Sequence, residues 1–213
     1  NGFKNNFNVY LKNLNSLGKD DPIYKSSPSL DGMSIFEIGS SLPLIKNDES
    51  KKEFLTPKIS LRVNPGNNMK DYSTSFKTIS ADNVFSINRL GIGDTFEAGK
   101  SITIGIDYKL DYENESYSLD DKTEEPEKNK FFEFKLATVL RDVAENEIPT
   151  SSTIDKKNSN IFGTINNELF ENLKFGYDFS IDNDFKTFES HSLNTEISIN
   201  NFVTEFNYIE ERA

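Results

Sequence analysis

The sequence predicts an all-β fold: antiparallel up-and-down strands that form part of a transmembrane outer-membrane β-barrel, with about nine strands in this piece. Three observations support this prediction. Apolar and polar residues alternate without a break along one long segment, and several further segments show the same period of two. The connections between these segments alternate between short and long, as they do between the two ends of outer-membrane barrels.

The alternation is clearest between residues 102 and 112. One phase holds the apolar residues and ends in tyrosines: Ile102, Ile104, Ile106, Tyr108, Leu110 and Tyr112. The other phase holds Thr103, Gly105, Asp107, Lys109 and Asp111. A period of two is that of a strand, whereas an amphipathic helix repeats its apolar positions every three or four residues. Tyrosines at the end of the apolar face are typical of a strand that leaves hydrocarbon for headgroups.

Taken in order, the remaining alternating segments predict strands at residues 2–13, 33–45, 54–64, 132–140, 161–170, 173–181, 188–199 and 202–209. The 102–112 strand has a possible short extension at 84–87. Pro43 removes a ladder donor near the end of the second strand, and Pro57 and Pro65 bracket the third. The connections at 16–32, 66–82 and 144–159 are long and those at 46–52, 171–172 and 200–201 are short. The charged segment 113–130 is an exception, because a short turn was expected there.

Composition narrows the classes of function. The chain has 213 residues, 35 % hydrophobic residues, 18 Phe, no Cys and a net charge of −11. Sparse apolar residues spaced one in two suit barrel strands, and no run of about 18 apolar residues predicts a spanning helix. The negative charge disfavours a nucleic-acid partner, since phosphate contacts need clustered Lys and Arg. The sequence starts without Met and ends inside a strand pattern, so we expect residues 1–213 to be a single barrel domain truncated at both ends.

Three motifs could suggest chemistry, and each has a plainer explanation. Gly91-Ile92-Gly93 lacks the third glycine of a phosphate loop and predicts a turn with positive φ. His191 and Ser192 are adjacent on a strand and point to opposite faces, so they form no dyad. The acidic residues of 120–127 lack calcium-loop spacing and predict a solvated loop. We therefore expect no catalytic, cofactor or metal residue and no enzymatic activity.

The strand phases assign two faces. The predicted lumen-facing polar residues are Arg62, Asp107, Lys109, Lys135 and Asp178. The predicted lipid-facing residues are Ile102, Ile104, Ile106, Phe132, Phe134, Phe175 and Phe179. Cations on the polar face, which also include Lys174, have two explanations. They meet phosphates of a passing ligand, or they pair with neighbouring carboxylates such as Asp107 and Glu133.

Four consecutive features carry a resemblance to a known family. They are a strand from Leu55-Thr56-Pro57 to Pro65, the Tyr/Ser-rich segment 71–75, a motif formed by Asn88, Arg89, Gly91, Gly93 and Asp94, and a long strand opening on Thr103-Ile104-Gly105. Over about residues 36–112 the sequence resembles the LPS-assembly protein (LptD) family, also called the organic solvent tolerance family. Two departures are Thr95, where many relatives have Arg, and the absence of the cysteines that some relatives use to tie the barrel to a periplasmic domain.

The resemblance implies a barrel in the cell outer membrane of a Gram-negative bacterium. Such a barrel receives lipopolysaccharide from a periplasmic LptA-like bridge, through an N-terminal domain, and releases it sideways into the outer leaflet. It also implies an LptE-like lipoprotein plug and contact with outer-membrane lipid. The lateral gate lies between the first and last strands of the whole barrel, which we expect outside this piece.

Two alternatives remain open from the residues alone. Another outer-membrane barrel, a porin or receptor, would lack an upstream periplasmic jellyroll domain. A soluble secreted β-sandwich that binds sugar or protein would need its apolar faces to meet, with residues such as Ile104, Phe134 and Phe179 buried between two stacked sheets.

Overall fold

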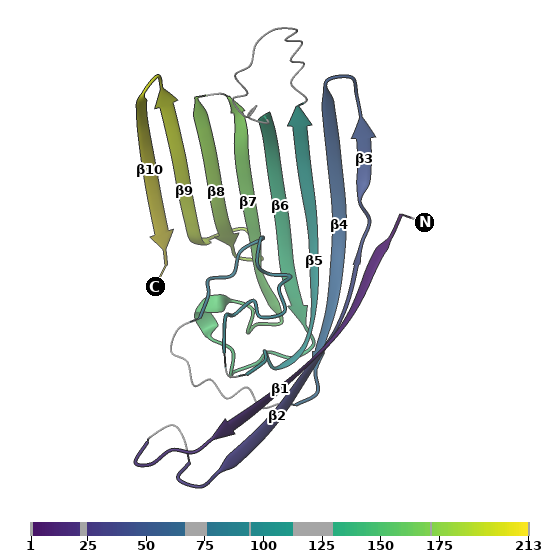
Figure 1. Ribbon diagram of the computed structural model, residues 1–213, viewed down its shortest axis with the longest axis vertical. Helices are drawn as coiled ribbons and strands as arrows, with labels where there is room; N and C mark the ends of the chain where they lie inside the picture. Colours follow the sequence, from purple (N-terminus) through teal and green to yellow (C-terminus); the bar gives the residue numbers. More distant parts are fainter. Residues whose placement is uncertain are drawn as a thin grey trace, which may run out of the picture.

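The structure is a computed structural model that describes residues 2–21, 25–66, 76–93, 95–112, 130–170 and 172–212. The described strands join in one antiparallel, ten-stranded sheet (Figure 1). They are β1 (Lys4–Ser16), β2 (Ser29–Ser41), β3 (Leu44–Asn47), β4 (Lys51–Asn64), β5 (Gly99–Tyr112), β6 (Lys130–Arg141), β7 (Asn158–Phe170), β8 (Leu173–Ile181), β9 (Phe188–Ile199) and β10 (Phe202–Glu211). A single 3₁₀ turn, η1 (Thr150–Ser152), interrupts the β6–β7 connection.

Apart from β3, each strand pairs with the next along the chain, in the order β1-β2-β4-β5-β6-β7-β8-β9-β10. β2 and β3 do not pair with each other, and both pair with β4. The sheet is open, so the two chain ends lie at opposite edges of it (Figure 1). The strand order confirms the prediction of an all-β, up-and-down fold. An open sheet is expected for a part of a barrel, because closure needs the remaining strands. β8 and β9 have the predicted bounds, and the other strands differ from prediction by a few residues at their ends.

The predicted strand 33–45 is two strands, because the chain breaks at Leu42 and Pro43. Pro57, expected before the third strand, lies inside β4 opposite this break. Its carbonyl accepts a hydrogen bond from the Leu42 amide at 3.0 Å. Proline has no amide hydrogen to donate, so β4 tolerates Pro57 only where the neighbouring strand is interrupted.

The β1–β2 hairpin extends beyond the rest of the sheet. β1 and β2 pair over their full length, from Lys4↔Ser41 to Ser16↔Ser29, whereas β2 pairs with β4 only between Phe36 and Ser41. The far half of the hairpin therefore projects past the end of β4, at the lower end of the sheet (Figure 1).

A second layer lies on one face of the sheet. It consists of the end of the β4–β5 connection, residues 76–93 and 95–98, here called the covering segment, together with the β6–β7 connection that contains η1 (Figure 1). The hydrophobic core forms between this layer and the sheet, and its members are Ile79, Ala81, Val84, Leu90, Ile92, Ala98, Ala137, Val139, Ile148, Ile154 and Phe162. The expected strand extension at 84–87 is wrong: these residues form turns within the covering segment.

Two predicted loops fall mostly outside the described residues, namely most of 66–82 and nearly all of the charged segment 113–130. Within the described part of the chain, no helix is long and apolar enough to cross a membrane.

Candidate functional site

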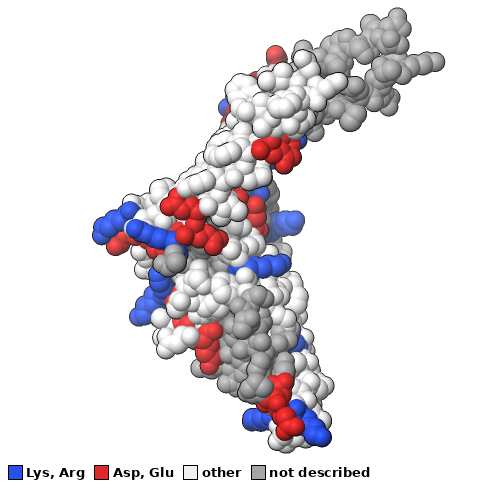
Figure 2. Space-filling model, turned by 90° about the vertical axis from the view of Figure 1, so that its left-hand side faces the viewer, with Lys and Arg blue, Asp and Glu red and all other residues white. Residues whose placement is uncertain are grey.

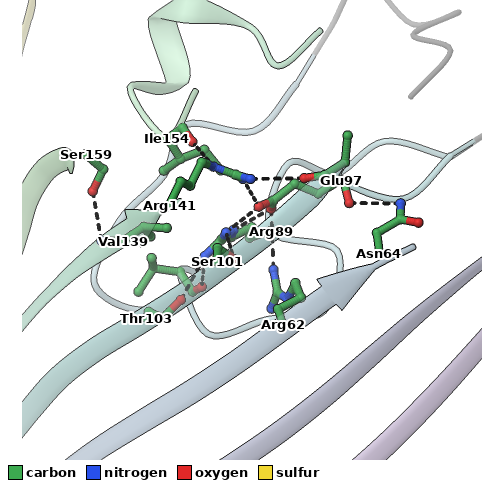
Figure 3. Close-up of polar contacts among 12 residues, drawn as sticks. Arg62, Asn64, Arg89, Glu97, Ser101, Thr103, Val139, Arg141, Ile154 and Ser159 are labelled. Atoms are coloured by element: carbon green, nitrogen blue, oxygen red, sulfur yellow. Dashed lines mark hydrogen bonds and ion pairs between the residues drawn. The ribbon is translucent and has the colours of Figure 1, made fainter. Parts of the chain in front are cut away.

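A buried carboxylate joins the covering segment to the sheet (Figure 3). Glu97, at the end of the covering segment, accepts hydrogen bonds from Arg89 Nε at 2.6 Å and from Arg89 Nη2. Arg62 from β4 and Arg141 from the end of β6 also pair with Glu97. Because side chains from three separate segments converge on one carboxylate, Glu97 holds the covering segment against two strands that are not adjacent.

The same arginines bind further groups. Arg62 Nη2 donates to Glu37 Oε2 of β2 at 3.0 Å and to the Ser86 carbonyl at 2.8 Å. Arg89 donates to the hydroxyls of Thr103 and Ser101 on β5, at 3.0 and 3.1 Å. Glu37, Arg62, Arg89, Glu97 and Arg141 are here called the Glu97 cluster, and it sets three guanidinium groups against two carboxylates. Burial of a guanidinium group without partners is costly, but every N–H group of Arg89 has a hydrogen-bond acceptor.

The electrostatics of Glu97 follow from these neighbours. Burial by itself raises the pKa of the Glu97 carboxyl, but the charge of Arg89 and its hydrogen bonds, then Arg62 and Arg141, lower it, and the resulting pKa is about 2. A carboxylate among three guanidinium groups is far more stable charged than neutral. Glu97 is therefore ionised at any physiological pH.

An aromatic contact fixes the middle of the covering segment. Phe85 lies so close to Gly105 of β5 that a Cβ atom added there would be 2.8 Å from its ring and 2.9 Å from the Leu136 carbonyl oxygen. The Lys58 ammonium of β4 lies 4.4 Å from the centroid of the Phe85 ring and 2.7 Å from Asp107 Oδ2. Gly105 therefore provides the space in which the covering segment sits on the sheet.

The register places polar and apolar rows on opposite faces of the sheet. Directly paired residues share a face. One row on the covered face reads Thr56, Asp107, Lys135, Thr164, Asp178 and Ser192, from β4 to β9. The neighbouring row on the opposite face is apolar across eight strands: Leu44, Leu55, Tyr108, Phe134, Ile165, Tyr177, Leu193 and Tyr208.

The apolar band is displaced along the strands from one edge of the sheet to the other. At β3–β4 the next row on the same face, two residues from Leu44 and Leu55, holds the ion pair Lys46–Glu53, with 3.6 Å between Nζ and Oε1. At β9–β10 the charged pair lies on the other side of the apolar row, where His191 Nε2 is 3.3 Å from Glu210 Oε2. A slab of hydrocarbon that crosses tilted strands meets each strand at a different residue level, and such a displacement is expected there.

The two faces differ from those of a soluble protein. On the apolar face, opposite the covered face, many large side chains of the described residues are exposed, among them Phe7, Leu11, Ile38, Ile104 and Phe206. Arg62, Arg89 and Glu97 on the covered face are instead at most 7 % exposed. No second sheet covers the apolar face within the described chain.

Over residues 10–213 the sequence matches the family described as LptD: LPS transport system D. The chain belongs to this family. A search of curated proteins gives no match. The LptD family transports lipopolysaccharide. The sheet described above, with one apolar and one polar face, therefore belongs to a family of transport and assembly proteins of the outer membrane.

Within this LptD-family chain, the motif residues have distinct places. Arg89 is 1 % exposed and belongs to the Glu97 cluster. The Asn88 carbonyl accepts a hydrogen bond from the Gly91 amide at 3.1 Å, and Gly91 has a φ of 72°. Gly93 was also expected to have a positive φ and does not, although its carbonyl accepts from Lys12 Nζ at 2.8 Å. Asp94 lies outside the described residues.

By register, all five predicted lumen-facing residues lie on the covered face. Their contact with a lumen stays a prediction. Each of the five pairs there with an oppositely charged group or a hydroxyl, Arg62 with Glu37 as described above. Lys135 Nζ lies 2.8 Å from Asp82 of the covering segment and 3.0 Å from Glu133. Further pairs are Lys109–Asp111 at 2.8 Å, Lys58–Asp107 at 2.7 Å, Thr164–Asp178 at 2.6 Å and Lys174–Glu196 at 2.9 Å.

The seven predicted lipid-facing residues share the opposite face by register: Ile102, Ile104, Ile106, Phe132, Phe134, Phe175 and Phe179. Ile104 is 43 % exposed, and Phe134 and Phe179 are partly buried by their neighbours on the same face. The Phe179 ring lies over Gly163, where an added Cβ atom would be 2.1 Å from it. Their contact with acyl chains is proposed below.

The sequence analysis missed Glu37, Glu97 and Arg141. Glu37 and Arg141 could have been noticed as charges in the polar phase of strands whose other positions are apolar. Glu97 gives no such signal, because it lies in a connection, and only its position among Phe96 and Ala98 marks it as a buried charge.

Proposed function

We propose that this chain is part of an outer-membrane barrel that delivers lipopolysaccharide to the outer leaflet. Its apolar face touches acyl chains, and its polar face lines a passage in which saccharide and phosphate groups keep polar contacts. The barrel works with an LptE-like lipoprotein plug and with an LptA-like bridge that meets an N-terminal domain of the full-length protein. It acts without catalysis: its mechanism is physical separation of the two halves of an amphiphile.

The observation that carries this proposal is the inversion of the two faces. A strand sheet in water buries its apolar side and exposes its polar side. Here the exposed side holds a row of apolar residues eight strands wide, while charged side chains such as Arg62 and Glu97 lie under the chain's own connection. This arrangement is favourable only if the apolar side has a nonaqueous surrounding.

The side of the molecule at the β10 edge supports the same proposal. Acidic and basic side chains are intermixed there, without a large field of one sign (Figure 2). A wall with both signs of charge and many hydroxyl groups accommodates saccharide and phosphate without trapping either.

The test is depletion of the full-length protein in cells that make lipopolysaccharide. Newly made lipopolysaccharide should stop reaching the cell surface, as measured by whole-cell antibody labelling, and should accumulate in the inner-membrane fraction. The protein itself should fractionate with the outer membrane and migrate faster in a gel before boiling than after. If surface labelling continues while uptake of small solutes falls, the protein is a porin and the proposal is wrong.

A further inference from the structure

The covering segment protects only part of the polar face. On β4 to β7 the end of this face under the covering segment is buried, since Arg62, Thr103, Val139 and Phe162 are at most 3 % exposed, whereas Lys109 and Asp111 farther along β5 are partly exposed. On β9 and β10 no described residue is buried, and on β8 only Ser180 is. The polar face is therefore divided into a covered half, β4–β7, and an open half, β8–β10.

The covering segment cannot leave the covered half without exposing buried charge. Its departure would separate Glu97 from Arg62 and Arg141, and Arg89 from Thr103 and Ser101. These charge-assisted hydrogen bonds would be lost together, and core residues of the covering segment such as Val84 and Leu90 would be exposed to water. The contact of Phe85 with Gly105 would be lost as well. The segment is thus a fixed part of the wall and leaves no path between itself and β4–β7.

The open half carries a groove where it meets the covering segment. The groove has a volume of about 500 Å³, and a smaller hollow of about 250 Å³ adjoins it, since both share Thr78, Ile79, Ser190 and Glu211. Hydroxyl groups dominate the lining, from Thr78, Ser80, Ser152, Thr153, Ser180, Ser190 and Ser192. Charges of both signs complete it: Asp178, Glu189, Glu211, Lys156 and Arg212.

This lining suits a saccharide that bears anionic groups. Hydroxyl side chains both donate to and accept from sugar hydroxyls, and carboxylates such as Asp178 and Glu211 accept from them. Lys156 and Arg212 supply positive charge for phosphate or acidic sugars. Phe76, Ile79, Phe162, Phe179 and Ile209 add apolar surface to the lining, beside its hydroxyl and charged groups.

We propose that the saccharide part of lipopolysaccharide passes over the open half, β8–β10, and not over the covered half, β4–β7. This inference rests on the proposed function, because it names the wall of that same passage. The covered half then serves as a rigid filler that narrows the passage, and the hydroxyl groups of β8 and β9 form its contact surface.

The test compares two positions on the covered face. Ser192 on β9 lies in the open half, and Ser60 on β4 lies in the covered half, where it is 6 % exposed. Each is replaced in the full-length protein by a photo-reactive phenylalanine analogue, in cells whose own copy is depleted. After irradiation, adducts are probed with antibody to lipopolysaccharide. We expect a clear lipopolysaccharide adduct at Ser192 and none above background at Ser60, because a side chain under the covering segment is excluded from contact.

A second position guards against misfolding. Asn194, exposed on the same face of β9, takes the analogue if Ser192 does not tolerate it, and a gel before and after boiling checks that each variant is folded. Equal adducts at Ser60 and Ser192 overturn the inference. So does a lipoprotein adduct in place of lipopolysaccharide, which would make the open half a protein-docking surface. If folded variants export lipopolysaccharide but neither β9 position gives an adduct, the inference fails and the proposed function stands. If cells depleted of the protein export lipopolysaccharide as well as cells that carry the unsubstituted protein, the proposed function itself is rejected.

Discussion

Under the covering segment, on β4–β6, the polar face of the sheet is buried and its charges are paired with one another, whereas on β9–β10 the same face is open and its charges lie at the surface. The pairs differ accordingly: Arg89 and Glu97 are almost fully buried, while Lys174 and Glu196 are 40 % and 25 % exposed. One face of one sheet thus serves as an interior in one half and as a surface in the other. The difference comes from the covering segment, which the sequence places between β4 and β5.

The largest effect is expected from Glu97→Ala. Three guanidinium groups then share only Glu37 in a buried place, and we expect a loss of about 3–5 kcal/mol of unfolding free energy. Urea unfolding of the purified full-length protein in detergent measures it. Glu196→Ala on β9, which removes the exposed partner of Lys174, is the matched control and should change the midpoint little. Equal shifts for the two variants would mean that the covered half is no more interior than the open one.

Ile106→Arg should have the next largest effect. Ile106 lies on the apolar face in the row next to Tyr108, and a charge at a lipid-facing midplane costs about 2–4 kcal/mol. We expect impaired assembly, measured as loss of the fast-migrating form before boiling. Asp107→Asn, the neighbouring residue on the other face, should be mild, since it weakens only the partly exposed pair with Lys58. Normal assembly of Ile106→Arg would show that this face does not meet lipid.

Gly105→Ala probes the fit of the covering segment. The new methyl group would lie within 3 Å of both the Phe85 ring and the Leu136 carbonyl, and overpacking of this kind costs about 1–3 kcal/mol. The measurement is again urea unfolding. Gly176→Ala on β8 is the control, because its nearest neighbour is the Asn166 side chain at 3.3 Å. If Gly176→Ala destabilises as much as Gly105→Ala, the covering segment does not pack closely on β5.

The smallest effect is expected from pH within the physiological range. The pKa of Glu97 falls from its ordinary value of 4.5 to about 2, so its contribution to stability is complete above pH 4.5 and is lost as pH falls from 4.5 toward 2. Hydrogen exchange of the covering-segment amides should be the same at pH 5 and pH 8 after correction for the intrinsic rate, and faster near pH 3. A rise between pH 8 and pH 5 would contradict the charged state of Glu97.

The alternation of residues predicted most of the sheet, because each strand has one apolar phase that a period of two reveals. The prediction failed for β4, where the neighbouring strand is interrupted. Pro57 was expected to bracket the third strand together with Pro65, yet it lies within β4, since the break at Pro43 removes the partner for its missing amide hydrogen. Sequence spacing does not show which residues face each other across two strands.

The Glu97 cluster was the least predictable feature. Its members lie at positions 37, 62, 89, 97 and 141, and only the register of β2, β4, β5 and β6 brings them together. Arg62 and Arg89 were singled out in the sequence, one as a polar strand position and one as a motif residue, but nothing in their spacing indicated a common partner. The sequence did indicate that Lys109, Lys135 and Lys174 could pair with carboxylates on the same face. Of the two partners named, Asp107 and Glu133, only Glu133 binds one of these lysines, Lys135.

The wide separation of those five residues along the chain has a consequence for how the barrel forms. Loop closure over long distances is slow, and contacts of this kind develop late. Arg141 joins Glu97 only after β6 has paired with β5, so the last ion pair of the cluster is made when the first six strands are already side by side. Until that moment the Arg141 guanidinium lacks its carboxylate partner, so this side of the nascent sheet is stable only away from hydrocarbon.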